Sequence, residues 1–427
     1  MLEKAKDSGV RILRWSERYT KTDMVYLIKN TSWLNLNFIF SSVFAFLLSI
    51  AFANLLTKTE YGTYQYILSI SSLLVAFTFT GFNTAIAQSV ARGYEGTFRA
   101  SIRPQLVWNL LPAVAALLWG GYYLALGNLV LAFGLFCVGF SLPLINTFNS
   151  YTAFLVGKQN FRLQSFYAIT SNAAYYVCIF LCVLFLPQAL LLVFINLAIT
   201  SATAIFFYFR TVRKFRTEGG NDPEAFSYAR HLSVMNVLNT IAGQMDNLLV
   251  FHFLGAAELA IYGIATLLPE KVGGLLKPIT SAAFPRFASR DIGSVRDNFG
   301  RRLLWFFALI IACVGLYILI APPLFSFIYP AYSMAVPYSQ LYAFTLVSFI
   351  GGITTAVLSA HRKVKELYLF NIVVPIIQIT LQTVAIIQWG LWGIVGAKIA
   401  SSVLASIIAV ILFYAVKTNS NGQTINK

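Results

Sequence analysis

Twelve apolar stretches dominate this sequence, and each is long enough to cross the roughly 30 Å apolar core of a bilayer as a helix. The chain of 427 residues is 58% hydrophobic and only 11% charged, whereas soluble domains carry about 25% charged residues. This composition predicts an all-α integral membrane protein. The stretches cover residues 34–56, 63–90, 104–124, 128–155, 163–186, 188–209, 231–254, 257–283, 303–329, 336–360, 367–388 and 391–416.

The positions of the basic residues predict the topology. Of the 31 lysines and arginines, all but Lys58, Lys271, Lys277 and Lys398 lie in the two terminal segments and in the loops after even-numbered stretches. The positive-inside rule therefore predicts that both termini are cytoplasmic. The net charge of +16 is then a signal of membrane topology, and it gives no support to a nucleic-acid partner.

The longest inside loop divides the twelve stretches into six and six. We therefore predict a basic cytoplasmic N-terminus at 1–33, an N-terminal six-helix lobe at 34–209, a cytoplasmic linker at 210–230, a C-terminal six-helix lobe at 231–416 and a cytoplasmic tail at 417–427.

A short motif supports this division because it occurs once in each half, at the same topological place and 198 residues apart. It predicts a parallel repeat, in which a pseudo-two-fold axis along the membrane normal relates the two lobes. The matching positions are Leu56, Glu60, Gly62 and Tyr64 in the first half, and Leu254, Glu258, Ala260 and Tyr262 in the second.

The stretch "LLPEKVGGLLKPI" places Glu270, Lys271 and Lys277 inside a predicted span. A charge at the centre of a spanning helix costs about 2.5–3.5 kcal/mol on insertion scales, so such residues normally face a partner or a water-filled cavity. Together with the prolines and glycines around them, they predict a bent helix beside a polar lumen. The alternative is a Glu270–Lys271 pair that only neutralises the helix.

Other polar residues in the second half extend this predicted lumen. A stripe at helical spacing holds Asn236, Asn239, Thr240 and Asn247, with Asp246 on its flank. The same asparagines could instead hydrogen-bond a neighbouring helix. Lys398 either faces the lumen or extends outward to the membrane surface. Asp246 and Glu270 are the candidates for coupling transport to a proton or cation.

No enzyme chemistry is predicted. The three histidines form no metal-ligand set, no phosphate-binding loop of the G-x-x-x-x-G-K-[ST] type occurs, and the outside loops are too short for a catalytic domain. We expect no metal and no cofactor. The four cysteines lie inside apolar stretches and do not predict disulfides.

Two segments carry a family resemblance: "LTKTEYGTYQYILSISSLLVAFTFTGFNTAIAQSVARGYEG" and "GAAELAIYGIATLLPEKVGGLLKPITSAAFPRFASRD". They resemble the Wzx-type polysaccharide and O-antigen flippases of the multidrug/oligosaccharidyl-lipid/polysaccharide (MOP) exporter superfamily. The resemblance extends to chain length and helix number. It implies a V-shaped bundle of two six-helix lobes around a central lumen.

The resemblance also implies a function. Such flippases move undecaprenyl-diphosphate-linked oligosaccharides across the cytoplasmic membrane, so Lys271, Lys277 and Lys398 would neutralise the diphosphate while polar side chains bind the sugar. The implied partners are the bilayer, a polysaccharide polymerase and chain-length proteins. The alternatives are a cation-coupled multidrug exporter of the same superfamily, or a non-transporting scaffold or enzyme of polysaccharide assembly. Drug exporters commonly use an acidic residue in the first helix, and this chain has none there.

Overall fold

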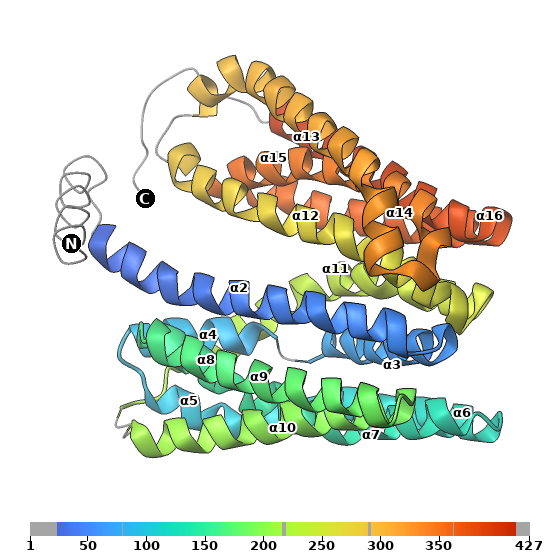
Figure 1. The fold of residues 1–427 in the computed structure, drawn as a ribbon. Coiled ribbons are helices and arrows are strands. Elements are labelled where there is room, and N and C mark those ends of the chain that lie inside the picture. Colours follow the sequence, from blue (N-terminus) through green and yellow to red (C-terminus); the bar gives the residue numbers. More distant parts are fainter. Residues whose placement is uncertain (1–23, 79, 216–218, 289–291, 362, 416–427) are drawn as a thin grey trace, which may run out of the picture. The chain divides into compact units, whose positions relative to one another are not determined.

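The computed structural model describes residues 24–78, 80–215, 219–288, 292–361 and 363–415, and every regular element in these ranges is a helix (Figure 1). Most of the predicted N-terminal segment and the whole of the predicted C-terminal tail therefore lie outside the described residues. The side chains of two candidate site residues, Asn236 and Lys277, also fall outside the description. Contacts between Cα atoms divide the chain into two compact units.

The first unit consists of residues 1–51 and 77–234. Asparagine side chains cap two of its helices, because Asn128 accepts a hydrogen bond from the N–H of Leu131 and Asn160 accepts one from the N–H of Leu163. Its elements are α2 (Met24–Leu55) as far as residue 51, then α4 (Gly81–Ala91), α5 (Gly96–Ala100), α6 (Ile102–Ala125), α7 (Leu129–Phe148), α8 (Ser150–Gly157), α9 (Phe161–Phe185), α10 (Ala189–Lys214) and the start of α11 (Ala225–Leu254).

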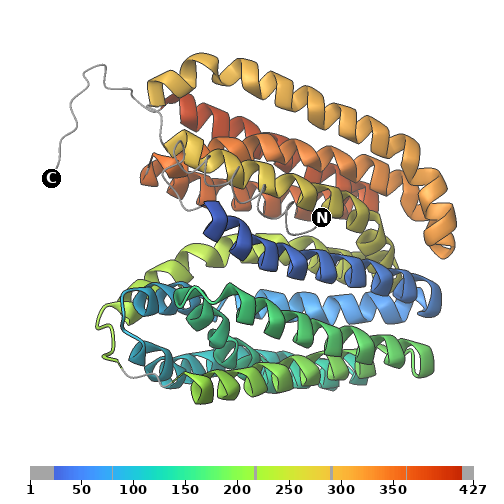
Figure 2. The ribbon, with the colours of Figure 1, turned by 60° about the vertical axis from the view of Figure 1, so that its left-hand side comes forward.

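An aromatic core joins several short and long helices of this unit, which are blue to green in Figure 2. Phe98 of α5 stacks on Phe154 of α8 with ring centroids 4.6 Å apart, and Tyr167 of α9 stacks on Phe207 of α10 at 4.2 Å. All four side chains are almost completely buried. In a bilayer the hydrophobic effect does not drive helices together, because the lipid is itself apolar. Aromatic pairs such as these add dispersion energy that holds the helices in contact.

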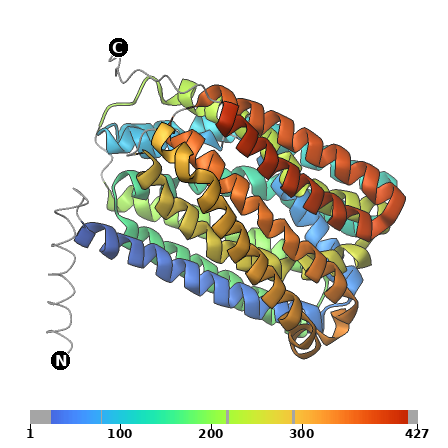
Figure 3. The ribbon, with the colours of Figure 1, turned by 90° about the horizontal axis from the view of Figure 1, so that it is seen from above.

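The second unit consists of residues 52–76 and 235–427. Its last helix covers two predicted spans, 367–388 and 391–416. Between them, at Gly390, the backbone leaves the helical conformation (φ 55°, ψ −133°). Only glycine adopts this conformation readily. It reverses the direction of the chain, and the two arms form a hairpin (Figure 3). The elements are α3 (Lys58–Val75), the rest of α11, α12 (Ala256–Ala288), α13 (Ile292–Ile328), η1 (Pro330–Ala335), α14 (Val336–Tyr342), η2 (Ala343–Val347), α15 (Ser348–Ala360) and α16 (Val364–Ala415).

The compact units differ from the predicted lobes at α3, which the sequence assigned to the first lobe and the structure packs on α12. The cause is a close approach of the two backbones. A Cβ atom on Gly62 would come within 1.7 Å of the carbonyl oxygen of Ala256, so only glycine fits there. The two repeated motifs therefore pack against each other.

The seam between α3 and α12 also supports the predicted repeat. The side chain of Gln65 lies against Gly263, where a Cβ atom would meet its amide at 2.2 Å. These two residues are 198 apart, the same offset as the matched positions, and each directly follows the last matched tyrosine of its motif. Equivalent positions contact each other where a two-fold axis passes, as in isologous interfaces.

Three of the predicted spans, 63–90, 128–155 and 257–283, are long, and their length predicts that they tilt or bend in the membrane. The span 63–90 is divided into α3 and α4 by residues 76–80, and the span 128–155 is divided at Asn149. The span with "LLPEKVGGLLKPI" is different, because α12 continues without interruption from 256 to 288. Its prolines and glycines are accommodated within one helix.

Length and composition support the membrane assignment. Among the described residues, eight helical stretches are long and apolar enough to cross a membrane, and the last of these, Lys365–Ala415, includes both arms of α16.

Candidate substrate and coupling site

A buried carboxylate on α11 is the centre of the candidate site in the second unit. Asp246 is 5% exposed, and its Oδ2 accepts hydrogen bonds from the Tyr262 hydroxyl at 2.9 Å and from Lys398 Nζ at 2.6 Å. Its Oδ1 accepts a third bond from the N–H of Asn247 at 3.0 Å. The ammonium and the two neutral donors satisfy the hydrogen-bonding capacity of this buried carboxylate.

A second carboxylate lies further along α12. Glu270 follows Tyr262 by eight residues, or about 12 Å at 1.5 Å per residue. The residue is exposed, and its Oε1 accepts a hydrogen bond from the Tyr342 hydroxyl at 3.1 Å. The rings of Tyr262 and Tyr342 meet edge to face, with centroids 6.2 Å apart. Two tyrosines thus connect the buried carboxylate with the exposed one.

The hairpin of α16 explains how Lys398 reaches α11. On the first arm, Gln378 donates a hydrogen bond to the carbonyl oxygen of Ala242 at 2.8 Å, one helical turn before Asp246. On the returning arm, Lys398 is eight residues after the reversal at Gly390. Both arms therefore contact the same side of α11, and this packing brings the lysine to the aspartate.

Most other predicted site residues lie at exposed or half-exposed positions. Lys271 and Asn239 are exposed, while Thr240 and Asn247 are half-buried. Within the part of the chain that the structure describes, Lys271 forms no ion pair. An exposed lysine that has no ion-pair partner among the described residues can receive an anionic ligand.

The structure brings together residues that the sequence analysis treated separately. The sequence predicts that Lys398 either faces the lumen or extends outward, whereas in the structure it is the ion-pair partner of Asp246, with a side chain 18% exposed. The bonding partner of Glu270 is Tyr342, which the sequence analysis did not select. Tyr262 belongs to the repeated motif, but the motif does not predict its hydrogen bond to Asp246.

This arrangement allows one specific exchange. The Lys398 ammonium can leave Asp246 for a phosphate group, because both are oxyanions that accept charge-assisted hydrogen bonds. The carboxylate that is released then lies buried without its cation. A buried carboxylate in that state needs another positively charged partner.

Comparison with protein families identifies the relatives of this chain. The family model described as "Polysaccharide biosynthesis protein" matches residues 27–290. The chain therefore belongs to this family, and the predicted membership of the MOP superfamily is confirmed. No curated protein matches the chain.

Solved structures show the same fold. An inward-facing multidrug resistance MATE family transporter of the MOP superfamily aligns with 88% of this chain and 95% of its own, with a TM-score of 0.65 and 15% identity. The outward-facing form of such a transporter aligns with 91% and 93%, with a TM-score of 0.53 and 14% identity.

A third structure is that of a MOP superfamily transporter from Pyrococcus furiosus, whose description notes a reverse polarity of the binding pocket. It aligns with 92% of this chain and 95% of its own, with a TM-score of 0.53 and 14% identity. The all-α transporter fold predicted from the sequence is thus confirmed, and the chain is a multi-pass membrane protein of a transporter-type family.

Proposed function

We propose that this protein is a flippase that translocates undecaprenyl-diphosphate-linked oligosaccharide across the cytoplasmic membrane by alternating access. The observation that carries the proposal is the Lys398–Asp246 pair at 2.6 Å together with the exposed Lys271, which forms no ion pair within the described residues. Membership of the polysaccharide biosynthesis family supports a glycan substrate rather than a drug.

In this proposal the diphosphate first meets Lys271 and then draws Lys398 away from Asp246. Each charge-assisted contact contributes about 1.5–3 kcal/mol. Asp246 then takes up a proton or cation, and the Tyr262–Tyr342 pair connects it with Glu270. Asn239, Thr240 and Asn247 supply hydrogen-bond partners for the sugar. Asn236 and Lys277 belong to the same proposed lumen by their place in the sequence.

The proposal also covers location and chemistry. The protein would lie in the cytoplasmic membrane with both termini inside, act without a metal or cofactor, and catalyse no covalent reaction. A polysaccharide polymerase and chain-length proteins would act on the exported product. Flux of the lipid-linked substrate, an ion gradient or the membrane potential would drive transport, since one charge crossing 100 mV corresponds to about 2.3 kcal/mol.

A second candidate function is cation-coupled drug export, which the likeness to multidrug MATE transporters favours. The sequence of α2 speaks against it, because Met24–Leu55 contains no acidic residue. A glycan flippase has no need of a cation-binding carboxylate in that helix.

Liposomes that contain the purified protein and a fluorescent lipid-linked oligosaccharide separate the two functions. We expect the labelled lipid to become accessible to an external quencher faster than in protein-free liposomes. We expect no transport of cationic drugs by the protein. Proton- or sodium-driven efflux of a cationic drug without lipid translocation would assign the protein to the drug exporters instead.

A further inference from the structure

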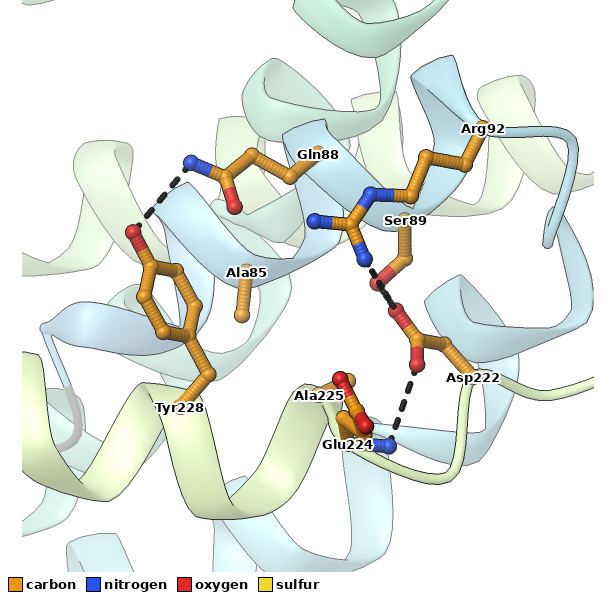
Figure 4. A pocket seen from close by; sticks show the side chains of 8 residues that line it. All are labelled: Ala85, Gln88, Ser89, Arg92, Asp222, Glu224, Ala225 and Tyr228. Carbon is orange, nitrogen blue, oxygen red and sulfur yellow. Dashed lines mark hydrogen bonds and ion pairs between the residues drawn. The ribbon is translucent and has the colours of Figure 1, made fainter. Parts of the chain in front are cut away.

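A polar cavity of about 230 Å³ lies within the first unit, where the end of α4 meets the linker before α11 (Figure 4). Gln88, Ser89 and Arg92 of α4 form one side of it. Asp222, Glu224 and Tyr228 form the other side. None of these residues takes part in the proposed transport site, which belongs to the second unit.

Asp222 holds this cavity in shape. Its carboxylate accepts hydrogen bonds from the Ser89 hydroxyl at 2.6 Å and from the N–H of Glu224 at 3.0 Å, and its own N–H donates to the Thr97 hydroxyl at 2.8 Å. The Ser89 hydroxyl, with the Glu224 N–H and the Arg92 guanidinium, lowers the pKa of Asp222 below its usual value. The carboxylate is therefore charged at neutral pH, and the linker is fixed to α4 and α5.

Two groups, Arg92 and Tyr228, have N–H or O–H protons that they can donate to a ligand in the cavity. The Arg92 guanidinium is 3.9 Å from the Asp222 carboxylate, too far for a direct hydrogen bond, and its side chain is 59% exposed. Gln88 donates to the Tyr228 hydroxyl oxygen at 3.2 Å, so the hydroxyl proton of Tyr228 can be donated elsewhere. On the opposite side, the exposed carboxylate of Glu224 is an acceptor (Figure 4).

The charges of the lining select a class of ligand. One guanidinium and two carboxylates face the same space, so a simple phosphate would be repelled by the acids and a simple cation by the arginine. A ligand that carries a phosphate joined to an ammonium group satisfies both sides. The neighbouring side chains of Tyr94 and Phe226 are 41% and 47% exposed, as is typical of aromatic residues at a membrane–water interface.

We propose that this cavity binds a phosphoethanolamine group, with the phosphate on Arg92 and Tyr228 and the ammonium on Glu224. The group is carried either by a phospholipid of the inner leaflet or by a soluble ester, and both present the same phosphate and primary ammonium.

Native mass spectrometry of the detergent-purified full chain, with added lipids, tests this proposal. We expect phosphatidylethanolamine to bind about tenfold more tightly than phosphatidylglycerol, because only the former provides an ammonium for Glu224. Phosphatidylcholine, whose ammonium has no N–H donor, should also bind weakly. Competition by free phosphoethanolamine at millimolar concentration assigns the site to a soluble ester, and lack of competition assigns it to the lipid.

Variants identify the cavity as the site. Arg92→Gln and Glu224→Gln should each abolish the preference for phosphatidylethanolamine, whereas Arg103→Gln, which removes an exposed charge from the first turn of α6 outside the cavity, should retain it. Circular dichroism confirms that each variant is folded. Equal binding of all three lipids by the parent protein, or an unchanged preference in both cavity variants, would overturn the proposal. Neither outcome bears on the flippase assay.

Discussion

At the scale of single residues, the exposed position of Lys271 on α12 leads to a charge-reversal prediction. Lys271→Glu should abolish glycan export, because it places a negative charge on the path proposed for the diphosphate. Lys271→Arg should retain much of the activity, since arginine also binds phosphate. Lys271→Gln should lose about 10- to 100-fold, corresponding to one charge-assisted contact. Export is measured at matched protein levels.

The control for this series is Lys365→Glu, which reverses an exposed lysine at the start of α16. It should export normally. Normal export by Lys271→Glu at parental protein levels would show that the lysine plays no part in substrate passage.

The Lys398–Asp246 pair makes a prediction about stability. Neutralising either partner alone leaves the other charge buried and unpaired, which costs about 3–5 kcal/mol. Asp246→Asn and Lys398→Gln should therefore each lower the melting temperature in detergent, and the double variant should recover most of the loss. The double variant should nevertheless transport poorly, because the exchange of Lys398 between carboxylate and phosphate is lost. A double variant that transports normally across pH and ion gradients would exclude a coupling role for this pair.

At the scale of helices, the seam between α3 and α12 depends on the missing side chain of Gly62. Gly62→Ala places a Cβ atom 1.7 Å from the carbonyl oxygen of Ala256, so the helices must separate. Such overpacking costs about 1–3 kcal/mol. Gly121→Ala in α6 is the matched control, because nothing lies within 4 Å of the added atom.

The control should be neutral or stabilising, because alanine favours a helix by about 1 kcal/mol over glycine. Thermal unfolding in detergent compares the two variants. If Gly62→Ala is as stable as Gly121→Ala, the two helices do not approach closely.

At the scale of the whole molecule, the distribution of basic residues predicts which loops face outward. Single cysteines at exposed Gln188 and Ala331 should react with a membrane-impermeant thiol reagent added to intact cells, whereas a cysteine at exposed Arg103 should react only after permeabilisation. The background lacks the four native cysteines. Labelling with the opposite pattern would invert the predicted topology.

Much of the fold was predictable because the bilayer requires it. A spanning segment must satisfy its own backbone hydrogen bonds, so each apolar stretch becomes a helix, and its length and charged flanks can be read directly. The site was predictable only by residue type. Asp246, Glu270, Lys271 and Lys398 were selected because charges in spans are costly, and nothing in the linear sequence selected Tyr342.

The membrane class, the helix positions, the repeat and the candidate charged residues can be predicted from the sequence, since they depend on local hydropathy and on spacing along the chain. The partners of these charged residues depend instead on how the helices pack. The reversal at Gly390 places Lys398 beside Asp246, 152 residues earlier, and the glycine contact at Gly62 places α3 with the second unit. Such pairings depend on which helix faces meet, and packing between helices in a bilayer is decided by the close fit of small residues rather than by hydropathy.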